Sequence, residues 1–430
     1  MMRYQQKSCR HEEGGRIVTE IAVVGLGYVG LPLAMAFCDA GVTVHGADID
    51  ADRAKMLWSG KSYIDDVPDS KVSEHIKSER FIVDRFPFDI KDCEAVFICV
   101  PTPCDRYKRP DLYYLSSAAE EVSWHMAKGQ LIIVQSTSWP GTTMDFVVPI
   151  LESRSGLSYT SEEFEIAFVP ERINPGGNAD IASVPKIVGT NTDAEFEHVK
   201  QLYSMIVVTV HRASTPATAE MAKLLENTFR AVNIALVNEI AMLCEKMGLD
   251  VWEVIEAAST KPYGFMPFYP SAGVGGHCIP VDPYYLLHKA AEYNTHLSIV
   301  ERALSINESM PQHVVGLVYK HAARRGIAIR DDNVLLIGGT YKPNVRDTRN
   351  APAGAIFDID RSFTVWDALL DDISLEQRLD GIDIAVILIN HDGVDYQMII
   401  DKTELVIDCC NATDGLCDDY GRVVRLGSGD

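Results

Sequence analysis

The chain has 430 residues, of which 47% are hydrophobic and 23% are charged, an ordinary globular composition with enough length for two or three domains. Its formal net charge of −22 argues against a nucleic-acid or anionic-membrane partner, because either would be approached against a repulsive field. The ten cysteines form no CxxC pair and no metal-ligand spacing with histidine, so we expect reduced, packed thiols and no metal site.

The start of the chain divides into a polar tail and an apolar segment. Residues 1–16 are mixed in charge and carry no apolar signal-peptide core, so we expect a flexible tail on a cytoplasmic protein. Residues 21–38 carry no charge over about the length of a membrane span. The glycines and Pro32 within that segment instead favour a strand, a tight turn and a helix that begins near Val29.

Short apolar runs follow one another through the first 170 residues, separated by segments long enough for helices. The runs that we expect to be strands are residues 17–25, 41–48, 95–101, 130–137 and 164–170. This alternation is typical of an open parallel sheet with helices on both faces. We therefore predict a doubly wound α/β domain over residues 17–212.

Between residues 213 and 330 the apolar period changes to 3.6, which predicts a central helical domain. Its longest helix covers residues 218–247 and ends at Gly248. This helix has more apolar surface than packing within one chain needs, so we expect a homodimer interface. Strands and helices alternate again over residues 331–430, which predicts a second, smaller α/β domain with a short first helix at about residues 351–356.

The glycine pattern GLGYVG directly follows the first strand and begins the first helix. Gly25 permits the tight turn, Gly27 lets the backbone approach a pyrophosphate, and Gly30 lets the helix pack closely on the strand. Asp48 ends the next strand, where a carboxylate can accept hydrogen bonds from a ribose, which favours NAD over NADP. Arg53 lies nearby, and its guanidinium could hold the 2′-phosphate of NADP, so NADP is the alternative cofactor. The alternative interpretation is a tight turn followed by a surface aspartate.

A second glycine pair, Gly338-Gly339, follows a strand of the last domain. It lacks a third glycine and an acidic residue at the matching distance, so we expect no dinucleotide there. Lys342, Arg346 and Arg349 in the next loop could supply positive charge to a mononucleotide diphosphate. A basic surface loop explains the same residues equally well.

The most unusual segment is residues 262–285, where prolines, glycines and aromatic residues surround one cysteine. Such a segment builds an ordered loop whose backbone can approach a ligand closely. Cys278 follows Gly275-Gly276-His277 and precedes Asp282 by four residues. A thiolate near a cation is a competent nucleophile toward an aldehyde, and a nearby carboxylate can act as base. A packed, unreactive cysteine is the alternative.

Other polar residues lie where ligand-facing groups are expected. Lys223 and Asn227 are four residues apart on the long helix and therefore share one face, although an ordinary amphipathic boundary would give the same pattern. Glu171 follows one buried strand, and Thr137 follows the strand before it. Both sit at the carboxyl end of a strand, the edge at which doubly wound sheets bind their ligands.

With these residues assembled, the chain from residue 17 resembles the UDP-glucose/GDP-mannose dehydrogenase family. The resemblance rests on GLGYVGLPLA, CVPTP, STSWPGTT, VPERINPG, AEMAKLLENTF, GVGGHCIPVDP and YKPNVRDTR, in that order. It implies two Rossmann-like domains, with NAD on the first and UDP on the last, joined by a helical dimerisation domain. It also implies a four-electron oxidation of a UDP-sugar that consumes two NAD.

The resemblance implies roles for the residues named above. A water held by Thr137 and Asp282 would accept the hydroxyl proton of the sugar in the first oxidation. Cys278 would attack the resulting aldehyde to give a thiohemiacetal and then a thioester, which water hydrolyses with Glu171 or Asp282 as base. Oxyanion stabilisation would come from Lys223 and Asn227.

The same resemblance assigns ligand contacts along the chain. The expected cofactor contacts are Gly25, Gly27, Tyr28, Val29, Gly30, Asp48, Arg53, Pro101, Thr102, Thr137 and Arg349. The expected substrate contacts are Glu171, Arg172, Lys223, Asn227, Tyr269, Gly275 and Lys342.

The loop sequence favours a branch of the family. GFMPFYP and GGHCIPVDPYYL resemble enzymes that oxidise UDP-N-acetylglucosamine. Where UDP-glucose enzymes place an arginine that reaches the partner subunit's sugar, this chain has Lys261-Pro262-Tyr263. UDP-N-acetylmannosamine and UDP-glucose remain alternative substrates. A two-electron dehydrogenase of the hydroxyacid type and a non-catalytic NAD-binding protein are more remote alternatives, and neither needs a reactive cysteine.

Overall fold

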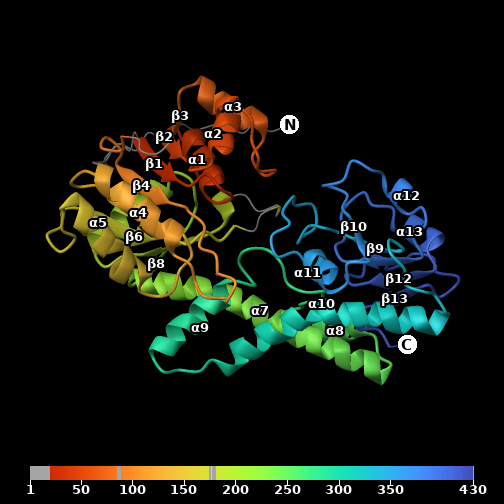
Figure 1. Cartoon of the computed structure of the whole chain (residues 1–430). Helices are drawn as coiled ribbons and strands as arrows, with labels where there is room; N and C mark the ends of the chain where they lie inside the picture. The colour runs from red at the N-terminus through yellow and green to blue at the C-terminus, as the bar shows by residue number, and fades with distance from the viewer. Residues whose placement is uncertain (1–19, 85–88, 174–175, 177–180, 430) are drawn as a thin grey trace, which may run out of the picture.

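The computed structural model describes residues 20–84, 89–173, 176 and 181–429. The tail expected at residues 1–16, Cys9 and the beginning of the first expected strand lie outside these residues. Figure 1 shows two α/β lobes that stand side by side on a layer of long helices. This arrangement confirms the predicted fold class of two Rossmann-like units joined by a helical region.

The first lobe is built on an eight-stranded sheet with the order β3-β2-β1-β4-β5-β6-β7-β8. The six strands at the β3 end have the Rossmann order, which places the ligand crevice between β1 and β4, where the strand order reverses. The strands are β1 (Glu20–Val24), β2 (Thr43–Ala47), β3 (Phe81–Asp84), β4 (Ala95–Ile98), β5 (Leu131–Val134), β6 (Glu165–Phe168), β7 (Lys186–Gly189) and β8 (Val210–Ala213).

Three of these strands were not predicted from the sequence. β3 is only four residues long, β7 is equally short, and β8 is short and largely exposed. β7 also pairs antiparallel with β6, so the sheet is mixed, whereas the sequence predicted parallel pairing throughout. Its antiparallel edge is common in large doubly wound sheets.

Helices cover both faces of this sheet, and a separate apolar core lies under each face. α1, α2, α3 and α6 pack on one face, while α4, α5 and the beginning of α7 pack on the other. The first-lobe helices are α1 (Gly30–Asp39), α2 (Ala51–Trp58), α3 (Asp69–Lys77), α4 (Tyr113–His125), η1 (Thr143–Val147, π-helical), α5 (Val148–Ser155), η2 (Ile181–Ser183, 3₁₀) and α6 (Asp193–Tyr203).

The central layer is formed by α7 (Pro216–Met247), α8 (Val251–Ser259), α9 (Asp282–Glu292) and α10 (Ser298–Arg325). The hydroxyl of Thr215 caps the first turn of α7, and the helix ends where Gly248 adopts a left-handed conformation with φ of 72°. α10 packs along α7 and continues under the second lobe, so the two long helices bridge both lobes.

The second lobe contains a parallel sheet with the order β10-β9-β11-β12-β13. α10 and α11 pack on one face of this sheet, and α12 and α13 pack on the other. Its elements are β9 (Val334–Ile337), α11 (Pro352–Ile359), β10 (Thr364–Trp366), α12 (Leu375–Arg378), β11 (Ile384–Ile387), α13 (Tyr396–Lys402), β12 (Leu405–Asp408) and β13 (Val423–Arg425). α11 is short, as predicted from the sequence.

Among the residues that the structure describes, no helix combines the length and apolar character that a membrane span requires. The nine cysteines among the same residues carry free thiols.

One partly buried histidine, His198, links two strands at the edge of the first sheet opposite the ligand crevice. His198 on α6 contacts Glu165 through Nδ1, and its Nε2 lies 3.0 Å from Glu94 Oε1. The hydrogen bond to Glu165 raises the pKa of His198, an effect that burial opposes and Glu94 reinforces.

This pair of contacts makes stability depend on pH. Because the folded-state pKa of His198 is raised, its stabilisation is complete below the unfolded pKa of about 6.5 and is lost as pH rises through the folded value. We expect His198→Gln to lower the free energy of unfolding by about 1–3 kcal/mol at pH 6 and by less at pH 9. Urea denaturation at both pH values checks this, and an equal loss at both would contradict it.

Candidate active site

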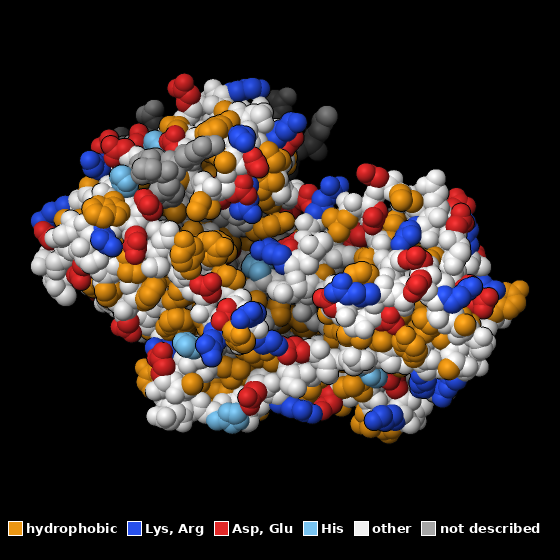
Figure 2. Space-filling model, viewed as in Figure 1, with side chains coloured by type: hydrophobic (Ala, Val, Ile, Leu, Met, Phe, Trp, Pro, Cys, Tyr) orange, Lys and Arg blue, Asp and Glu red, His pale blue; other side chains and the backbone are white. Residues whose placement is uncertain are grey.

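A cleft of about 2080 Å³ lies between the two lobes, above the central helices. Figure 2 shows the surface hollowed between the lobes. This volume exceeds the roughly 300–1,000 Å³ of a typical small-molecule site, so the cleft has room for more than one ligand. The expected site residues that line it are Gly25, Gly27, Tyr28, Val29, Asp48, Arg53, Pro101, Thr102, Thr137, Glu171, Lys223, Cys278, Asp282 and Arg349.

The glycine turn at the carboxyl end of β1 is shaped for a ligand. A Cβ on Gly25 would lie 2.8 Å from Cys99 O, and a Cβ on Gly30 would lie 1.9 Å from Gly25 O, so packing within the protein requires both glycines. A Cβ on Gly27 would contact no protein atom within 4 Å. The open space at Gly27, beside the N-terminus of α1, therefore fits a pyrophosphate that approaches the backbone.

Asp48 lies at the end of β2, next to this turn. Its carboxylate accepts hydrogen bonds from Leu26 N and Asp50 N, both at 2.9 Å, and it lines the cleft. Arg53 lies 3.5 Å from Asp48 and 3.5 Å from Asp50. Two carboxylates thus engage the guanidinium that could otherwise hold a 2′-phosphate, which favours NAD.

The second lobe reaches the cofactor turn through Arg349. Its guanidinium lies over the ring of Tyr28, 5.1 Å from the centroid, and its Nε is 2.9 Å from Asp347 Oδ1. Arg349 O also accepts a hydrogen bond of 2.8 Å from Gly276 N in the cysteine loop. One residue therefore joins the glycine turn, the cysteine loop and the second lobe.

Cys278 and Asp282 lie one helical turn apart at the beginning of α9. Asp282 N donates to Cys278 O at 2.8 Å, and both side chains line the cleft. Burial and Asp282 raise the pKa of Cys278 to about 11, more than Lys223, Arg230 and Arg349 lower it. The expected thiolate beside a cation is therefore not the resting state, and a neutral thiol needs a base.

Asp282 can be that base. Burial raises its pKa to about 6, although Lys223, Asn227 and Arg230 favour the charged form. Asn227 Nδ2 donates to the carboxylate, and Arg230 in turn donates to Asn227 Oδ1. Arg230 was not singled out from the sequence, although it follows Asn227 by three residues and so shares its helix face.

Lys223 reaches the same region from one turn earlier on α7. Its Nζ donates to Glu171 O at 2.7 Å, which places an ammonium beside the cysteine loop and the end of β6. Lys223 and Asn227 are both buried, so the shared face predicted from their spacing points into the site. The alternative of an exposed amphipathic boundary is excluded by this burial.

Glu171 is fully engaged by protein donors. Its Oε2 accepts from Lys186 at 2.7 Å, and its Oε1 accepts from the amides of Arg172 and Ile173. Burial alone would raise its pKa, but Lys186 and these amides lower the pKa below the usual range for glutamate. A carboxylate held this way is a weak proton acceptor, and the sequence offered no sign that Lys186 on β7 would reach it.

Thr137 lies just beyond β5, in a loop that α7 fixes in place. Buried Glu220 on α7 accepts from Gly141 N at 2.6 Å and from the Thr143 hydroxyl at 2.6 Å. Thr143 begins the π-helical turn η1, a feature that often marks functional sites. The sequence does not predict these hydrogen bonds to Glu220, because Gly141 and Thr143 lie far from it along the chain.

His277, directly before the cysteine, was also given no role from the sequence. Its Nδ1 is buried and has no hydrogen-bond partner within the described residues, and the side chain lines the cleft. Burial lowers the pKa of His277 to about 4, so the imidazole is neutral. An unpaired buried polar atom costs about 1–3 kcal/mol, which a ligand contact would recover.

Several expected ligand contacts lie outside the lining of the cleft. Tyr269 stacks on Trp252 with centroids 5.7 Å apart, and Arg172 pairs with Glu226 at 2.6 Å. The remaining residues of this group are Gly30, Asn227, Gly275 and Lys342. Gly30 serves helix packing as predicted, and a Cβ on Gly275 would lie 2.5 Å from Tyr341 Cβ, so that glycine also permits close packing.

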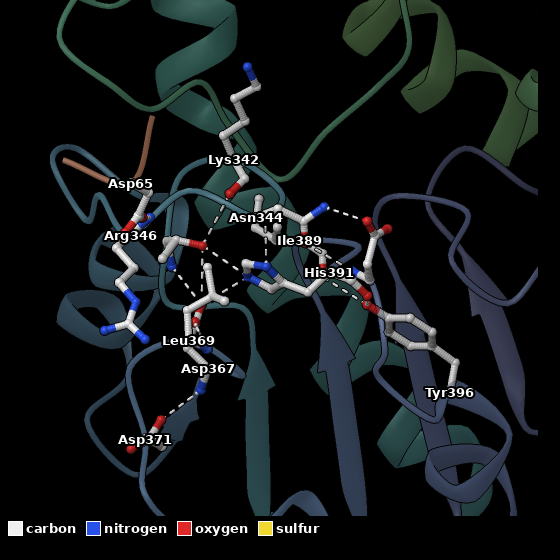
Figure 3. A network of polar contacts seen from close by, with 12 residues as sticks. Asp65, Lys342, Asn344, Arg346, Asp367, Leu369, Asp371, Ile389, His391 and Tyr396 are labelled. Carbon is white, nitrogen blue, oxygen red and sulfur yellow. Dashed lines mark hydrogen bonds and ion pairs between the residues drawn. The ribbon is translucent and has the colours of Figure 1, made fainter. Parts of the chain in front are cut away.

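The three basic residues after the second glycine pair do not converge. Figure 3 shows Lys342 and Arg346 pointing in opposite directions, and Arg346 N lies 3.4 Å from Asp65 of the first lobe. Arg349 turns toward Tyr28 instead. The three side chains therefore do not surround one common position in the structure.

The second glycine pair does have a matching carboxylate, contrary to the sequence interpretation. Asp367 follows β10 and accepts a hydrogen bond of 2.9 Å from Thr340 N. It was overlooked because the connection through α11 places it further along the chain than Asp48 lies from its own glycines.

Comparison with known proteins identifies related chains over most of the sequence. Residues 19–207 match the NAD binding domain of the UDP-glucose/GDP-mannose dehydrogenase family, and residues 217–309 match that family's central domain. The chain is 40% identical to a UDP-N-acetyl-D-glucosamine 6-dehydrogenase of Pseudomonas aeruginosa over 357 residues, which is 82% of each chain.

Solved structures agree with this. A UDP-N-acetyl-D-mannosamine dehydrogenase of Pyrococcus horikoshii superposes with a TM-score of 0.88 and 33% identity, covering 95% of this chain and 99% of the other. A UDP-glucose dehydrogenase of Pyrobaculum islandicum superposes with a TM-score of 0.80 and 25% identity, covering 92% and 95%.

The contacts of Asp48 generate a test of cofactor binding. We expect Asp48→Asn to weaken NADH binding by roughly tenfold to a hundredfold, because a charged acceptor contributes about 1.5–3 kcal/mol to its hydrogen bonds. Arg53→Ala is the control and should change NADH affinity little. Fluorescence titration with NADH and NADPH measures both, and undiminished NADH binding by Asp48→Asn would contradict the assignment.

Proposed function

The chain belongs to the UDP-glucose/GDP-mannose dehydrogenase family and is an NAD-dependent oxidoreductase, and we propose that it oxidises the C6 alcohol of UDP-N-acetylglucosamine to the carboxylate. One observation carries this proposal most directly. Cys278, Asp282 and Lys223 line one cleft that also contains the glycine turn of the NAD-binding lobe, and Asn227 contacts Asp282 from α7. This grouping supports Cys278 as the nucleophile, Asp282 as the base and Lys223 and Asn227 as the oxyanion donors.

The choice of sugar rests on the relatives. Relatives at 40% and 37% identity are named UDP-N-acetyl-D-glucosamine 6-dehydrogenases, from Pseudomonas aeruginosa and Salmonella typhi. A relative at 36% identity from Pyrococcus horikoshii is named UDP-N-acetyl-D-mannosamine dehydrogenase. UDP-N-acetylmannosamine is therefore the first alternative substrate and UDP-glucose the second, because one contact can set the choice at C2.

The first oxidation requires a base at the C6 hydroxyl. Bound NAD⁺ supplies the hydride acceptor in both oxidations. Asp282, with its pKa at about 6, is largely ionised at neutral pH and can take the hydroxyl proton through a water shared with Thr137. The product of this step is an enzyme-bound aldehyde.

The second oxidation requires a covalent intermediate. After the first proton has passed from Asp282 to solvent water in the cleft, Asp282 accepts the thiol proton of Cys278. The sulfur then bonds to the aldehyde carbon and gives the oxyanion of a thiohemiacetal. Lys223 and Asn227 donate toward the developing oxyanion from a buried face of α7, where fixed charges act strongly. Loss of hydride from the thiohemiacetal carbon leaves a thioester on Cys278.

Hydrolysis of the thioester completes the reaction. Water attacks the acyl carbon, and the Cys278 thiol leaves with a proton, which gives the free carboxylate. Asp282 is the base for this water, because Glu171 is already held by Lys186 and two backbone amides. Glu171 instead fixes Lys186 and the segment that begins with Arg172.

The UDP portion of the substrate is assigned to the second lobe. Lys342, whose side chain extends away from the buried polar network of that lobe in Figure 3, is one proposed contact, and Arg172, Tyr269 and Gly275 are the others. These four contacts are proposals that rest on the family resemblance. They require the substrate to extend past the cysteine toward the loop of Lys342.

We also propose a homodimer formed along α7. The exposed side chains on this helix form an apolar stripe with helical spacing: Met221, Leu225, Phe229, Leu236, Ile240, Leu243 and Met247. A continuous apolar stripe of this length is rare on the surface of a monomer. A two-fold axis across α7 would bury the stripes of two chains against each other.

The covalent scheme makes a prediction about stoichiometry. The wild-type protein should release two NADH for each UDP-sugar and form the carboxylate, whereas Cys278→Ala should stop after the first oxidation and form no acid. NADH absorbance and mass spectrometry of the product measure this across UDP-N-acetylglucosamine, UDP-N-acetylmannosamine and UDP-glucose.

Cys104 provides the matched control for this experiment. It lines the same cleft, and burial raises its pKa to about 12, so Cys104→Ala should retain two NADH per sugar. Acid formation at the wild-type rate by Cys278→Ala would disprove the covalent scheme.

The base makes a prediction about pH. Protonation of Asp282 removes the proton acceptor, so kcat/KM should fall about tenfold per pH unit below about pH 6. Asp282→Asn should lower kcat by about a hundredfold or more and abolish this acid limb. Asp358→Asn, a change at an exposed carboxyl on the cleft wall, should keep it. A wild-type profile that stays flat from pH 5 to 7 would rule out Asp282 as the base.

A further inference from the structure

The first lobe shows how a sheet of this kind presents a carboxylate to a nucleotide. Gly25 N donates to Ala47 O at 2.8 Å, and Leu26 N donates to Asp48 at 2.9 Å. Asp48 lines the cleft, where its carboxylate can accept hydrogen bonds from a ribose.

The second lobe repeats this arrangement, except that the amide that donates to the carboxylate lies one residue further along the chain. Gly338 N donates to Trp366 O at 2.9 Å, and Thr340 N donates to Asp367 at 2.9 Å. Asp367 also accepts from Leu369 N at 2.8 Å, as Asp48 does from the amide two residues after it. The two carboxylates therefore occupy equivalent places in the two sheets.

The second carboxylate differs in being covered by protein donors. Asp367 Oδ2 lies 3.1 Å from the hydroxyl of Thr340 and 3.1 Å from Nε2 of His391. The side chains of Asp367, Thr340 and His391 are at most 2% exposed. Burial opposes ionisation, but hydrogen bonds from His391, Leu369 and Thr340 lower the pKa of Asp367 well below its usual range.

His391 comes from the segment that follows β11. In the order β10-β9-β11, the switch point of the second sheet lies between β9 and β11, and this is where doubly wound sheets bind nucleotides. A hydroxyl and an imidazole N–H of the protein thus take the place of the two ribose hydroxyls. The side chains of Thr340 and His391 therefore fill the nucleotide crevice of the second sheet.

The other nitrogen of His391 holds the loop that follows the glycine pair. Nδ1 accepts from Asn344 N at 3.0 Å, which requires a neutral imidazole with its proton on Nε2. Asn344 has φ of 60° and exchanges two hydrogen bonds with Asp392, at 2.8 and 3.0 Å. The loop is therefore fixed at Thr340 and again at Asn344.

Lys342 lies between these two fixed points. Its carbonyl oxygen lies 3.3 Å from the Thr340 hydroxyl, whose single proton is directed at Asp367, so the position of this lysine is set by the fixed residues on either side of it. Figure 3 shows its side chain extending away from the network, on the side opposite Asp367. The buried network consequently sets the direction in which Lys342 leaves the second lobe.

We propose that His391 and Asp367 are positioning residues for the substrate, which fill the nucleotide crevice of the second sheet and thereby fix the loop that presents Lys342 to the UDP group. This inference rests on the proposed function, in which Lys342 contacts the substrate. Neither residue lines the cleft, so both would act on the substrate through the loop.

The test compares UDP and NADH affinities in two variants of the full-length protein. His391→Ala removes the acceptor for Asn344 N and a donor to Asp367, so we expect UDP to bind about tenfold more weakly by calorimetry. His391→Gln carries an amide with one donor and one acceptor and should recover most of this loss. NADH affinity should change less than twofold in both variants.

His198→Ala is the matched control, because it removes another histidine, partly buried between acidic partners, without touching the second lobe. It should lower thermal stability and leave both affinities unchanged. Unchanged UDP affinity in folded His391→Ala, or equal losses for UDP and NADH, would overturn the positioning role.

The same titrations separate this inference from the proposed function. If the wild-type protein binds UDP but releases no NADH from any UDP-sugar, the proposed reaction fails while the comparison of UDP affinities still decides the role of His391. If the wild-type protein does not bind UDP, both proposals fall.

Discussion

The buried carboxylate of Asp282 is the charge around which the cleft is organised. Taking a carboxylate out of water is unfavourable, and its pKa of about 6 shows that Asn227, Lys223 and Arg230 offset this cost only in part. Asn227 donates to the carboxylate, while Lys223 and Arg230 act on it through their charge. All three residues lie on one face of α7, so the placement of that helix helps to keep Asp282 ionised. A carboxylate poised in this way can exchange protons near neutral pH, which a fully solvated aspartate cannot do efficiently.

The two lobes contribute unequal halves of the site. The first lobe leaves open space at Gly27 and a carboxylate at Asp48 for a dinucleotide, whereas the second lobe fills the equivalent crevice with His391 and Thr340. α7 and α10 run beneath both lobes and hold them at a fixed separation. Two similar folds can therefore have different functions. The side chains at the point where the strand order reverses determine whether the crevice there can accept a ligand.

Local signals in the sequence were sufficient for the elements with strong periodicity. The apolar face of α7, its end at Gly248 and the turn from Gly25 to Gly30 depend on neighbours within a few residues, and the structure contains them as predicted. The pairing of Glu171 with Lys186, the hydrogen bonds to Glu220 and the network of His391 join residues far apart in the chain. No pattern in a single sequence predicts contacts between residues so far apart in the chain. The basic residues after Gly339 show the converse error, since proximity in sequence did not bring Lys342, Arg346 and Arg349 together.

The central claim is that Cys278 becomes bonded to the oxidised carbon of the sugar. The most direct measurement is a rapid acid quench during turnover with saturating NAD⁺ and UDP-N-acetylglucosamine, followed by digestion and peptide mass spectrometry. The account predicts the mass of a uronyl thioester on the peptide that contains Cys278. Turnover to the acid with that peptide unmodified, or with the adduct on another residue, would contradict it.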